Sequence, residues 1–353
     1  MSAALPVIVL GGSGYVAGEL LRLIAHHPRL KLAGAVSTSR EGEPIAAAFG
    51  HLCGVYPQQR FISAAQAVDG LGAAPRWIVI SAAPHGASAA LVDRLLEAAE
   101  RAALEMTVVD ASADFRYPSA ERFAAVYGQP HAAPGRMASF TCAVPEHVAA
   151  PATPHAAQPG CFTTAMLLAV VPLVARGLTR AEFFVSAVTG STGAGRTPRD
   201  TTHHPVRQSN LFAYQPLRHR HHPEVCELTR AATGRDITLH FVPQSGPFAR
   251  GIHATVFAAC ADGVDQAAAV GELAAFYDDA SFVRVGAAPP RLKDVVGTND
   301  AVLSVSADDG ALAVCCVLDN LVKGAAGGAI QWVNRLAGWP DTEGLVVAPA
   351  GWV

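Results

Sequence analysis

A strand, a glycine turn and a helix follow one another at the start of the chain. Leu5–Leu10 is a continuous apolar run, glycines and a serine fill positions 11–14, and residues 19–25 carry apolar side chains at helical spacing. Such a turn lets a pyrophosphate approach backbone N–H groups at a helix N-terminus. The pattern predicts a dinucleotide site, against the alternative of a purely structural turn. The residues expected to contact the cofactor here are Gly11, Ser13, Gly14, Tyr15 and Ala17.

Strands and helices continue to alternate over the first ~110 residues, which is typical of a parallel, doubly wound sheet. Strands are predicted at 31–36, 77–81 and 107–110, and a helix at 89–103. Ligands bind at the carboxyl ends of such strands, so Pro84, after the third strand, is expected beside the cofactor. The stretch 117–158, rich in Pro, Ala and His, is interpreted as a connecting region.

Beyond residue 160 the strands lack regular helical crossovers, which predicts a mixed or antiparallel sheet with helices to one side. The predicted fold is therefore α/β. A Rossmann-type doubly wound dinucleotide-binding domain spans 1–159 and is completed by a C-terminal helix at 321–353, and an α+β domain with a mixed sheet spans 160–320. Its strands are expected at 183–189, 238–242, 254–259, 301–306 and 311–318.

Composition narrows the class of protein. Of 353 residues 51% are hydrophobic and 16% charged, which describes a globular chain with a sizeable core. The net charge of -3, with Lys and Arg dispersed, argues against nucleic acid or membrane as partners. The seven cysteines form no C-x-x-C pair, so no disulfide framework or zinc ribbon is expected. No signal peptide or membrane span is recognised, and a cytoplasmic enzyme acting on a small molecule is the expectation.

Cys161 is the candidate nucleophile. Pro159 and Gly160 break the chain just before it, and residues 163–174 form an apolar helical pattern. This places the sulfur at a helix N-terminus, where unpaired N–H groups and the helix dipole lower the pKa of a thiol. The alternative is a small hydrophobic residue packed at the start of a helix.

The second strand ends in Ser37-Thr38-Ser39-Arg40, where an NAD-specific site would usually carry an acidic residue. The hydroxyl groups, with Ser37 and Ser39 foremost, and the Arg40 guanidinium suit a ribose 2′-phosphate, so NADP(H) is predicted. Arg40 as a solvated loop charge, with Glu41 and Glu43 nearby, is the alternative.

Further polar residues are candidates for anion binding. Ser112 and Arg116 lie in the segment 110–116, which follows a strand, so its polar groups are expected to face the cofactor cleft. The alternative is a turn that holds a salt bridge. The loop 190–196, which contains Gly193, suits an anion or the backbone of a partner subunit. Arg250 precedes a strand and can clamp a carboxylate or phosphate, unless it is an ordinary surface charge.

Five histidines lie between residues 203 and 222, and His219 and His221 would share one face of an extended segment. No carboxylate or thiolate stands at the usual ligand spacing, so no metal is predicted. One histidine serving Cys161 as acid and base is the simpler interpretation, and the others are expected at a surface or interface.

Taken together, the motifs GGSGYVAGEL (11–20), SADFRY (112–117), QPGCFTTA (158–165), HRHHPEV (219–225) and LDNLVKGAAGGAIQ (318–331) resemble the N-acetyl-γ-glutamyl-phosphate reductases of arginine biosynthesis. The resemblance implies NADPH-dependent reduction of an acyl phosphate through a thioester on Cys161, with His219 as acid and base near a neutral pKa. It further implies that 1–159 is the NADP-binding domain and that 160–320 is the α+β catalytic and dimerisation domain of a homodimer or homotetramer. Arg250 is expected on the substrate carboxylate, and Gly193 and Asn320 on the cofactor, with Asn320 at the nicotinamide. Ser112 and Arg116 are expected near the phosphate and Gln158 near the thiol. Ala143-Val144-Pro145-Glu146 departs from the family's Gly-Leu-Pro-Glu and leaves the role of Glu146 open.

Three alternatives remain. A sibling family reduces a carrier-protein-linked aminoadipyl phosphate in lysine biosynthesis and shares a His-His-Pro run like that at 203–205. That substrate should demand a basic docking surface. A non-catalytic NADP-binding regulator would have lost Cys161 or His219. The HRHHPEV and LDNLVKGAAGG elements discriminate against aspartate-semialdehyde dehydrogenase.

Overall fold

The computed structural model describes residues 4–351, which divide into two compact units. The first comprises the chain through Ala143, Ala149–Gln158 and Ala326–Leu345, and the second comprises Val144–Val148, Pro159–Ala325 and the residues after Leu345. This differs from the sequence-based division in four places. The segments 144–148, 321–325 and 346–351 group with the second unit, and so does Pro159. Within that unit a buried ion pair joins Glu146 to Lys323.

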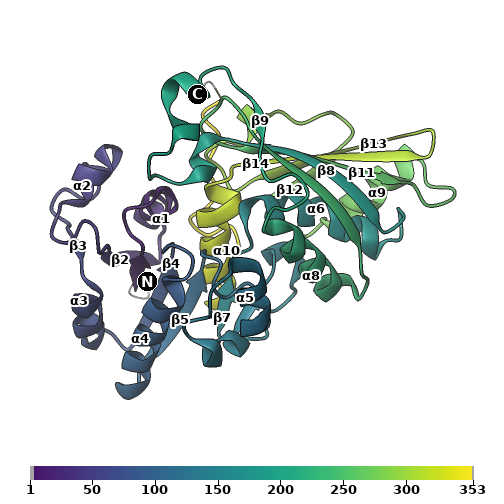
Figure 1. Ribbon diagram of the computed structural model, residues 1–353. Helices are drawn as coiled ribbons and strands as arrows, with labels where there is room; N and C mark the ends of the chain where they lie inside the picture. Colours follow the sequence, from purple (N-terminus) through teal and green to yellow (C-terminus); the bar gives the residue numbers. More distant parts are fainter. Residues whose placement is uncertain (1–3, 352–353) are drawn as a thin grey trace. The chain divides into compact units, whose positions relative to one another are not determined.

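The first unit is built on a seven-stranded parallel sheet in the order β3-β2-β1-β4-β5-β7-β6. The middle strands are fully buried because helices cover both faces. α1 (Tyr15–His26) and α10 (Gly327–Leu336) lie on one face, and α3 (Ala64–Asp69) and α4 (Ser88–Arg101) on the other (Figure 1). The strands are β1 (Leu5–Leu10), β2 (Leu30–Val36), β3 (Phe61–Ile62), β4 (Arg76–Ser81), β5 (Glu105–Asp110), β6 (Phe140–Cys142) and β7 (His155–Ala157).

The connecting region expected at 117–158 contains regular structure, so that interpretation is wrong. It holds α5 (Ala120–Tyr127) and the two short strands β6 and β7. β7 pairs with β5 through only two residues on each strand. Three-residue strands give no period-2 signal, which is why the sequence pattern missed them.

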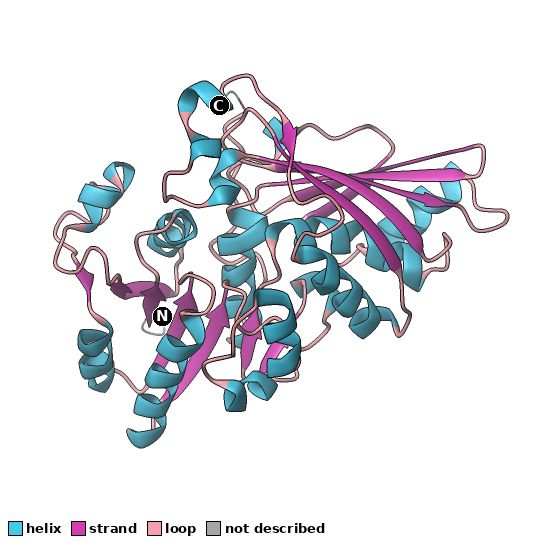
Figure 2. Cartoon of the chain, in the orientation of Figure 1, coloured by secondary structure: helices cyan, strands magenta, loops and turns pink. Residues whose placement is uncertain are grey.

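The second unit has a seven-stranded mixed sheet in the order β12-β13-β14-β11-β8-β10-β9, as predicted in kind. Only β8–β10 and β12–β13 are parallel pairs. Three helices, α6 (Cys161–Ala175), α8 (His221–Thr233) and α9 (Gln266–Phe276), lie on one side of it (Figure 2). The strands are β8 (Glu182–Thr189), β9 (Phe212–Ala213), β10 (Thr238–Ser245), β11 (Ile252–Ala259), β12 (Val283–Gly286), β13 (Ala301–Asp308) and β14 (Ala311–Leu318).

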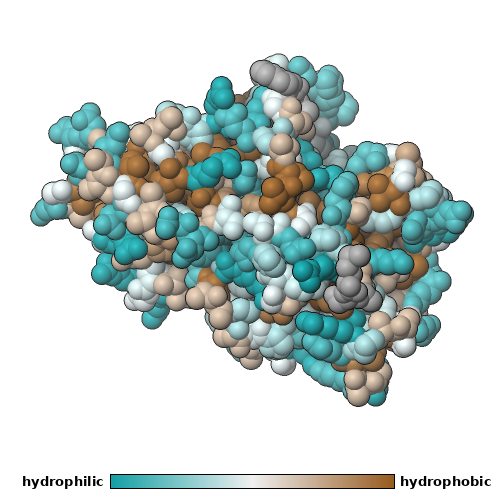
Figure 3. All heavy atoms as spheres, turned by 180° about the vertical axis from the view of Figure 1, so that it is seen from behind, coloured by the Kyte–Doolittle hydropathy of each residue, from teal (hydrophilic) through white to brown (hydrophobic). Residues whose placement is uncertain are grey.

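The two faces of this sheet differ in burial. Along β8, Phe183, Val185 and Ala187 are buried under the helices, whereas Phe184 on the other face is 52% exposed. Phe257 of β11 lies directly opposite Phe184 in the antiparallel register and is 48% exposed. Hydrophobic side chains are also visible on the molecular surface in Figure 3. The uncovered face of the sheet is therefore apolar at its centre.

The helix predicted from residue 321 is interrupted. A π-helical turn, Val322–Ala326, precedes α10, which begins at Gly327. Such turns are rare and are found mostly at functional sites. Here the turn carries two residues, Lys323 and Gly324, that contribute to the candidate site described next.

Candidate active site

Cys161 is the first residue of α6, as the sequence predicts, and its side chain is partly exposed. Residues 162–174 of this helix are buried and nearly all apolar, so the helix is fixed in the core and only its N-terminal end carries a reactive group. Gly160 is the N-cap and supplies no side-chain cap, so the first backbone N–H groups of α6 remain directed toward the thiol end. The dipole of α6 therefore favours a thiolate at Cys161.

The turn that leads into Cys161 is held by α8. The backbone N–H of Gly160 donates to Oε1 of the buried Glu224 at 2.7 Å. The His221 ring covers the same residue so closely that a Cβ atom at Gly160 would lie 2.3 Å from His221 Nε2. Glycine is therefore required before the thiol, and Glu224 is a positioning residue that we did not single out from the sequence.

The π-turn touches Cys161 from another direction. A Cβ atom at Gly324 would lie 2.7 Å from Cys161 Cβ. Beside it, the fully buried Lys323 forms an ion pair with Glu146, whose side chain is also buried. Burying two charges has a high desolvation cost, so this ion pair is expected to add little to the stability of the fold. Its role is better explained as holding the π-turn in position.

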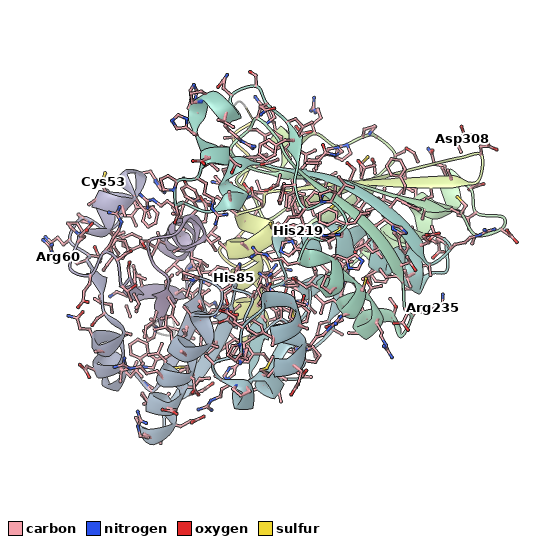
Figure 4. The ribbon with its side chains drawn as sticks, in the orientation of Figure 1. Cys53, Arg60, His85, His219, Arg235 and Asp308 are labelled. Atoms are coloured by element: carbon pink, nitrogen blue, oxygen red, sulfur yellow. The ribbon has the colours of Figure 1, made fainter. Side chains whose placement is uncertain are left out.

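His219 lies beside the first turn of α8 (Figure 4) and is 7% exposed. Its Nδ1 accepts the backbone N–H of His221 at 3.2 Å, so the neutral ring carries its proton on Nε2. The ring centroid is 5.8 Å from that of Phe162, the residue after Cys161, and 5.6 Å from that of Tyr214. His219 and Cys161 are thus brought to the same end of the α6–α8 pair.

Burial, and to a lesser extent the charge of Arg220, lowers the pKa of His219 to about 4. The expectation of a pKa near neutrality is therefore wrong for the protein alone, and the ring is uncharged at pH 7. The expectation that His219 and His221 share a face of an extended segment is also wrong, because His221 begins α8. Among residues 4–351 no cluster of ligating side chains suitable for a metal ion is found.

Arg250 and Asn320 belong to one network in the second unit. Arg250 Nε donates to Asp319 Oδ2 at 3.1 Å. The Asn320 side chain accepts the N–H of Gly251 at 2.7 Å and donates to Thr192 Oγ1 at 3.0 Å. Gly193 packs against Thr189, where an added Cβ would lie 3.2 Å from Thr189 Oγ1. The network fixes the loop geometry, while contacts of these residues with substrate or nicotinamide stay predictions.

The glycine turn of the first unit fits a dinucleotide. Gly11 has φ +71°, and a Cβ there would lie 2.5 Å from the carbonyl oxygen of Ala82, so only glycine is accommodated. Gly14 is the N-cap of α1 and supplies no side chain, which leaves the helix N-terminus accessible to a pyrophosphate. Tyr15 opens α1, Ala17 is buried in it, and Ser13 accepts a hydrogen bond from Ser37 at 3.1 Å.

The residues predicted to select NADP(H) lie together after β2. The Ser39 hydroxyl is 3.5 Å from that of Ser37, and Arg40 forms an exposed ion pair with Glu43 at 2.8 Å. Exposed pairs of this kind are weak, so Arg40 can exchange Glu43 for a phosphate at little cost. Pro84 follows β4, and the N–H of Gly86 nearby donates to Asp114 at 2.7 Å. Cofactor contacts at these positions stay predictions.

The three remaining predicted residues are buried in the first unit. The Ser112 hydroxyl donates to Asp110 at 2.8 Å, and Arg116 Nε donates to the carbonyl of Gln158 at 3.0 Å. The Gln158 amide packs against Gly328. Burial, and then the charge of Asp114, raises the pKa of Asp110. In this structure Arg116 holds the chain just before the Pro-Gly-Cys turn, and its contact with phosphate stays a prediction.

Comparison with known proteins agrees with this architecture. The NAD binding domain of semialdehyde dehydrogenases matches residues 6–140, and their dimerisation domain matches residues 161–320. The fold is similar to that of aspartate semialdehyde dehydrogenase II from Vibrio cholerae, with a TM-score of 0.68 at 16% identity over 96% of this chain and 99% of that one. It is also similar to the Candida albicans aspartate semialdehyde dehydrogenase solved with NADP, with a TM-score of 0.67 at 12% identity over 95% and 99% of the two chains.

Relatives with higher identity cover nearly the whole chain. N-acetyl-gamma-glutamyl-phosphate reductase from Rhodospirillum rubrum is 35% identical over 99% of both chains, and that from Pseudomonas aeruginosa is 37% identical over 96% of both. A protein of Aeropyrum pernix, named provisionally as a LysW-L-2-aminoadipate/LysW-L-glutamate phosphate reductase, is 33% identical over 99% of both.

The two domains define an oxidoreductase of the semialdehyde dehydrogenase class, with a nicotinamide-dinucleotide fold in the first unit. Within that class, the chain belongs to the N-acetyl-γ-glutamyl-phosphate reductase family. No helix among the described residues is long and apolar enough to cross a membrane.

Proposed function

We propose that the protein reduces N-acetyl-γ-glutamyl phosphate to N-acetylglutamate semialdehyde and inorganic phosphate, with NADPH as the reductant. The observation that carries the proposal is the placement of Cys161 at the N-terminus of a buried helix, with neutral His219 at the same end of the α6–α8 pair. The relatives at 35–37% identity that bear this reductase name support the choice of substrate.

In the proposed mechanism the Cys161 thiolate attacks the acyl carbon, and the bond from that carbon to the phosphate oxygen breaks to give a thioester and free phosphate. NADPH, when bound, supplies the hydride that reduces the thioester to the oxidation level of the aldehyde. His219 Nε2–H donates a hydrogen bond to the substrate oxygen as negative charge develops there. The oxyanion then re-forms the carbonyl as the carbon–sulfur bond breaks, so the aldehyde leaves and Cys161 is again a thiolate.

The reverse reaction gives the most direct test. Phosphate-dependent reduction of NADP is measured with N-acetylglutamate semialdehyde and, in parallel, with aspartate semialdehyde. We expect turnover with the first aldehyde and at least about 10²-fold lower kcat/KM with the second, because the second lacks the acylated part of the molecule. Equal rates with both aldehydes, or none with the first, would contradict the proposal.

The match of residues 161–320 to a dimerisation domain also supports a homodimer. We propose that it forms through the uncovered face of the second unit's sheet. Phe184 and Phe257 are adjacent in register at the centre of that face, and Leu217 beside them is 60% exposed. Exposed apolar surface of this kind is typical of subunit contacts. Light scattering should give twice the chain mass for the wild type and a monomer for Phe184→Glu. Val346→Glu, at a residue 74% exposed outside the sheet, is the control and should leave the dimer intact.

A second candidate function is the reduction of an acyl phosphate linked to a carrier protein. The positive charge of residues 196–220 favours it. Arg199, Arg218 and Arg220 are exposed there, together with His203 and His204. Such a surface suits an acidic carrier protein that bears the acyl phosphate, as the name of the Aeropyrum pernix relative describes for that protein. If the protein acts on the carrier-linked substrate, Arg199→Glu combined with Arg218→Glu should lower kcat/KM for that substrate and not for the free acyl phosphate. With a free substrate the double variant should behave as wild type.

A further inference from the structure

Two arginines of the second unit differ in how their charge is compensated. Arg250 donates to the fully buried carboxylate of Asp319, so its charge has an anionic partner within the protein. Arg207, the last residue of the short helix α7 (His204–Arg207), is only 9% exposed and has no carboxylate partner among the residues that the structure describes. Buried cations without a counter-ion are rare because desolvation of the charge is expensive.

Within the described part of the chain, the Arg207 guanidinium has only neutral partners. Nη1 donates to the Ser245 hydroxyl at 2.8 Å, Nη2 donates to the carbonyl oxygen of Gly246, and the group lies 5.7 Å from the centroid of the Phe212 ring. Its Nε is buried and has no hydrogen-bond partner among the described atoms. A buried donor left unpaired on a charged group indicates a place for an anion.

Arg207 is connected to the reactive end of α6 through Tyr214. The Tyr214 ring packs against His219, with 5.6 Å between centroids. Burial raises the pKa of Tyr214, a charge on Cys161 raises it further, and Arg220 and Arg207 lower it. Tyr214 also lies close to Arg207 along the sheet: it directly follows β9, whose Phe212 faces the guanidinium and pairs with Ser245, and its N–H donates to the carbonyl of Pro243 at 3.1 Å.

We infer that Arg207 binds the free carboxylate of the acyl phosphate substrate. The inference rests on the proposed function. It moves the carboxylate contact from Arg250, which Asp319 already neutralises, to an arginine that has no carboxylate partner among residues 4–351. The phosphate is bonded to the carbon that Cys161 attacks, so it must lie next to the sulfur. The carboxylate is several bonds farther along the substrate, which suits a guanidinium separated from the thiol by Tyr214.

The test compares two aldehydes that differ only in this carboxylate. N-acetylglutamate semialdehyde and 4-acetamidobutanal, its decarboxylated analogue, are assayed with NADP and phosphate for the wild type, Arg207→Met and Arg207→Lys. Because a buried charged contact is lost, Arg207→Met should lower kcat/KM for the first aldehyde roughly 10²-fold and leave kcat/KM for the analogue within about twofold. Arg207→Lys should recover part of the loss, since it retains the charge but not the fork of donors.

The other outcomes are separable. Equal loss for both aldehydes with an unchanged KM for phosphate, together with a lower melting temperature, would make Arg207 a purely structural clamp on Gly246. A raised KM for phosphate with both aldehydes would assign Arg207 to the phosphate instead. Arg180→Met, at an exposed arginine of the second unit with no proposed binding role, is the control and should change neither ratio. A wild-type enzyme inactive toward N-acetylglutamate semialdehyde would overturn the proposed function, and this assignment with it.

Discussion

Gly324 contacts Cys161 so closely that a methyl group added at Gly324 would lie 2.7 Å from Cys161 Cβ and 3.1 Å from its Cα. The backbone of the π-turn therefore forms one wall around the nucleophile. Since Cys161 is the first residue of a helix whose next thirteen residues are buried, the helix cannot shift to make room. Because Gly324 has no side chain, the Cys161 thiol can occupy its position at the start of α6.

The first prediction follows from this contact. Gly324→Ala should displace Cys161 and lower kcat at least about 10²-fold, because misplacement by about 1 Å is costly in catalysis. Steady-state rates and the rate of thiol alkylation measure the effect. Gly271→Ala in α9, where an added Cβ meets nothing within 4 Å, is the matched control. It should keep full activity and raise the free energy of unfolding by roughly 0.4–1 kcal/mol.

The second prediction concerns covalent catalysis. Cys161→Ser should abolish turnover and leave NADPH binding intact, since the hydroxyl has similar volume but is a far weaker nucleophile at neutral pH. Cofactor binding is measured by fluorescence titration and turnover by NADPH oxidation. Cys53→Ser, at an exposed cysteine of the first unit, is the control. Retention of more than about a tenth of the wild-type rate in Cys161→Ser would exclude a thioester on this residue.

The fold was predictable where local patterns repeat, and less so where contacts are long-range. The turn at Gly11 and the helix start at Cys161 depend on neighbouring residues, so the sequence indicated both. β7 exists only because β5 and β6 flank it. The low pKa of His219 is a consequence of burial, as is the position of Arg207 away from every carboxylate of residues 4–351, and burial depends on residues far away in the chain. HRHHPEV contained Glu224, yet only the structure reveals its bond to Gly160.

The third prediction concerns the choice of cofactor. Arg40→Asp should weaken binding of NADPH by about 1.5–3 kcal/mol and that of NADH by much less, because it removes a charged donor for the 2′-phosphate and adds a repelling charge. The ion pair with Glu43 is exposed, so its loss should leave the melting temperature unchanged. Dissociation constants for both cofactors provide the measurement. Equal losses for the two would limit Arg40 to a structural role.

The fourth prediction concerns stability against pH. Burial lowers the pKa of His147, His155 and His219 to about 4, against 6.5 in the unfolded chain. As pH falls below 6.5, these histidines bind protons in the unfolded state but not in the folded state. The free energy of unfolding must therefore fall. Between pH 6 and 5 each histidine should contribute a slope of up to about 1.4 kcal/mol per pH unit. Urea denaturation at several pH values measures this slope.

His147→Gln tests the assignment of the slope. His147 Nε2 lies 2.9 Å from the Tyr277 hydroxyl, which donates to the carbonyl of Leu168 at 2.7 Å, so the ring donates to Tyr277. A glutamine amide can replace that donor without titrating. The variant should therefore lose the contribution of His147 to the slope, up to about 1.4 kcal/mol per pH unit between pH 6 and 5. An unchanged slope would show that His147 is protonated in the folded state.

The last prediction concerns His219. If its Nε2–H stabilises the charge on the substrate oxygen, His219→Asn should lower kcat by roughly 10²–10⁴ and remove the limb of the pH profile that reports the ionisation of the ring. Because burial holds the pKa of the ring at about 4, that limb should appear on the acidic side, with activity falling as His219 becomes protonated. His222, whose Nε2 lies 2.9 Å from the carbonyl of Leu239, is the control, and His222→Asn should keep most activity. Full activity in His219→Asn, or inactivation of the wild type by EDTA, would contradict this role of His219 and favour metal binding by the histidines instead.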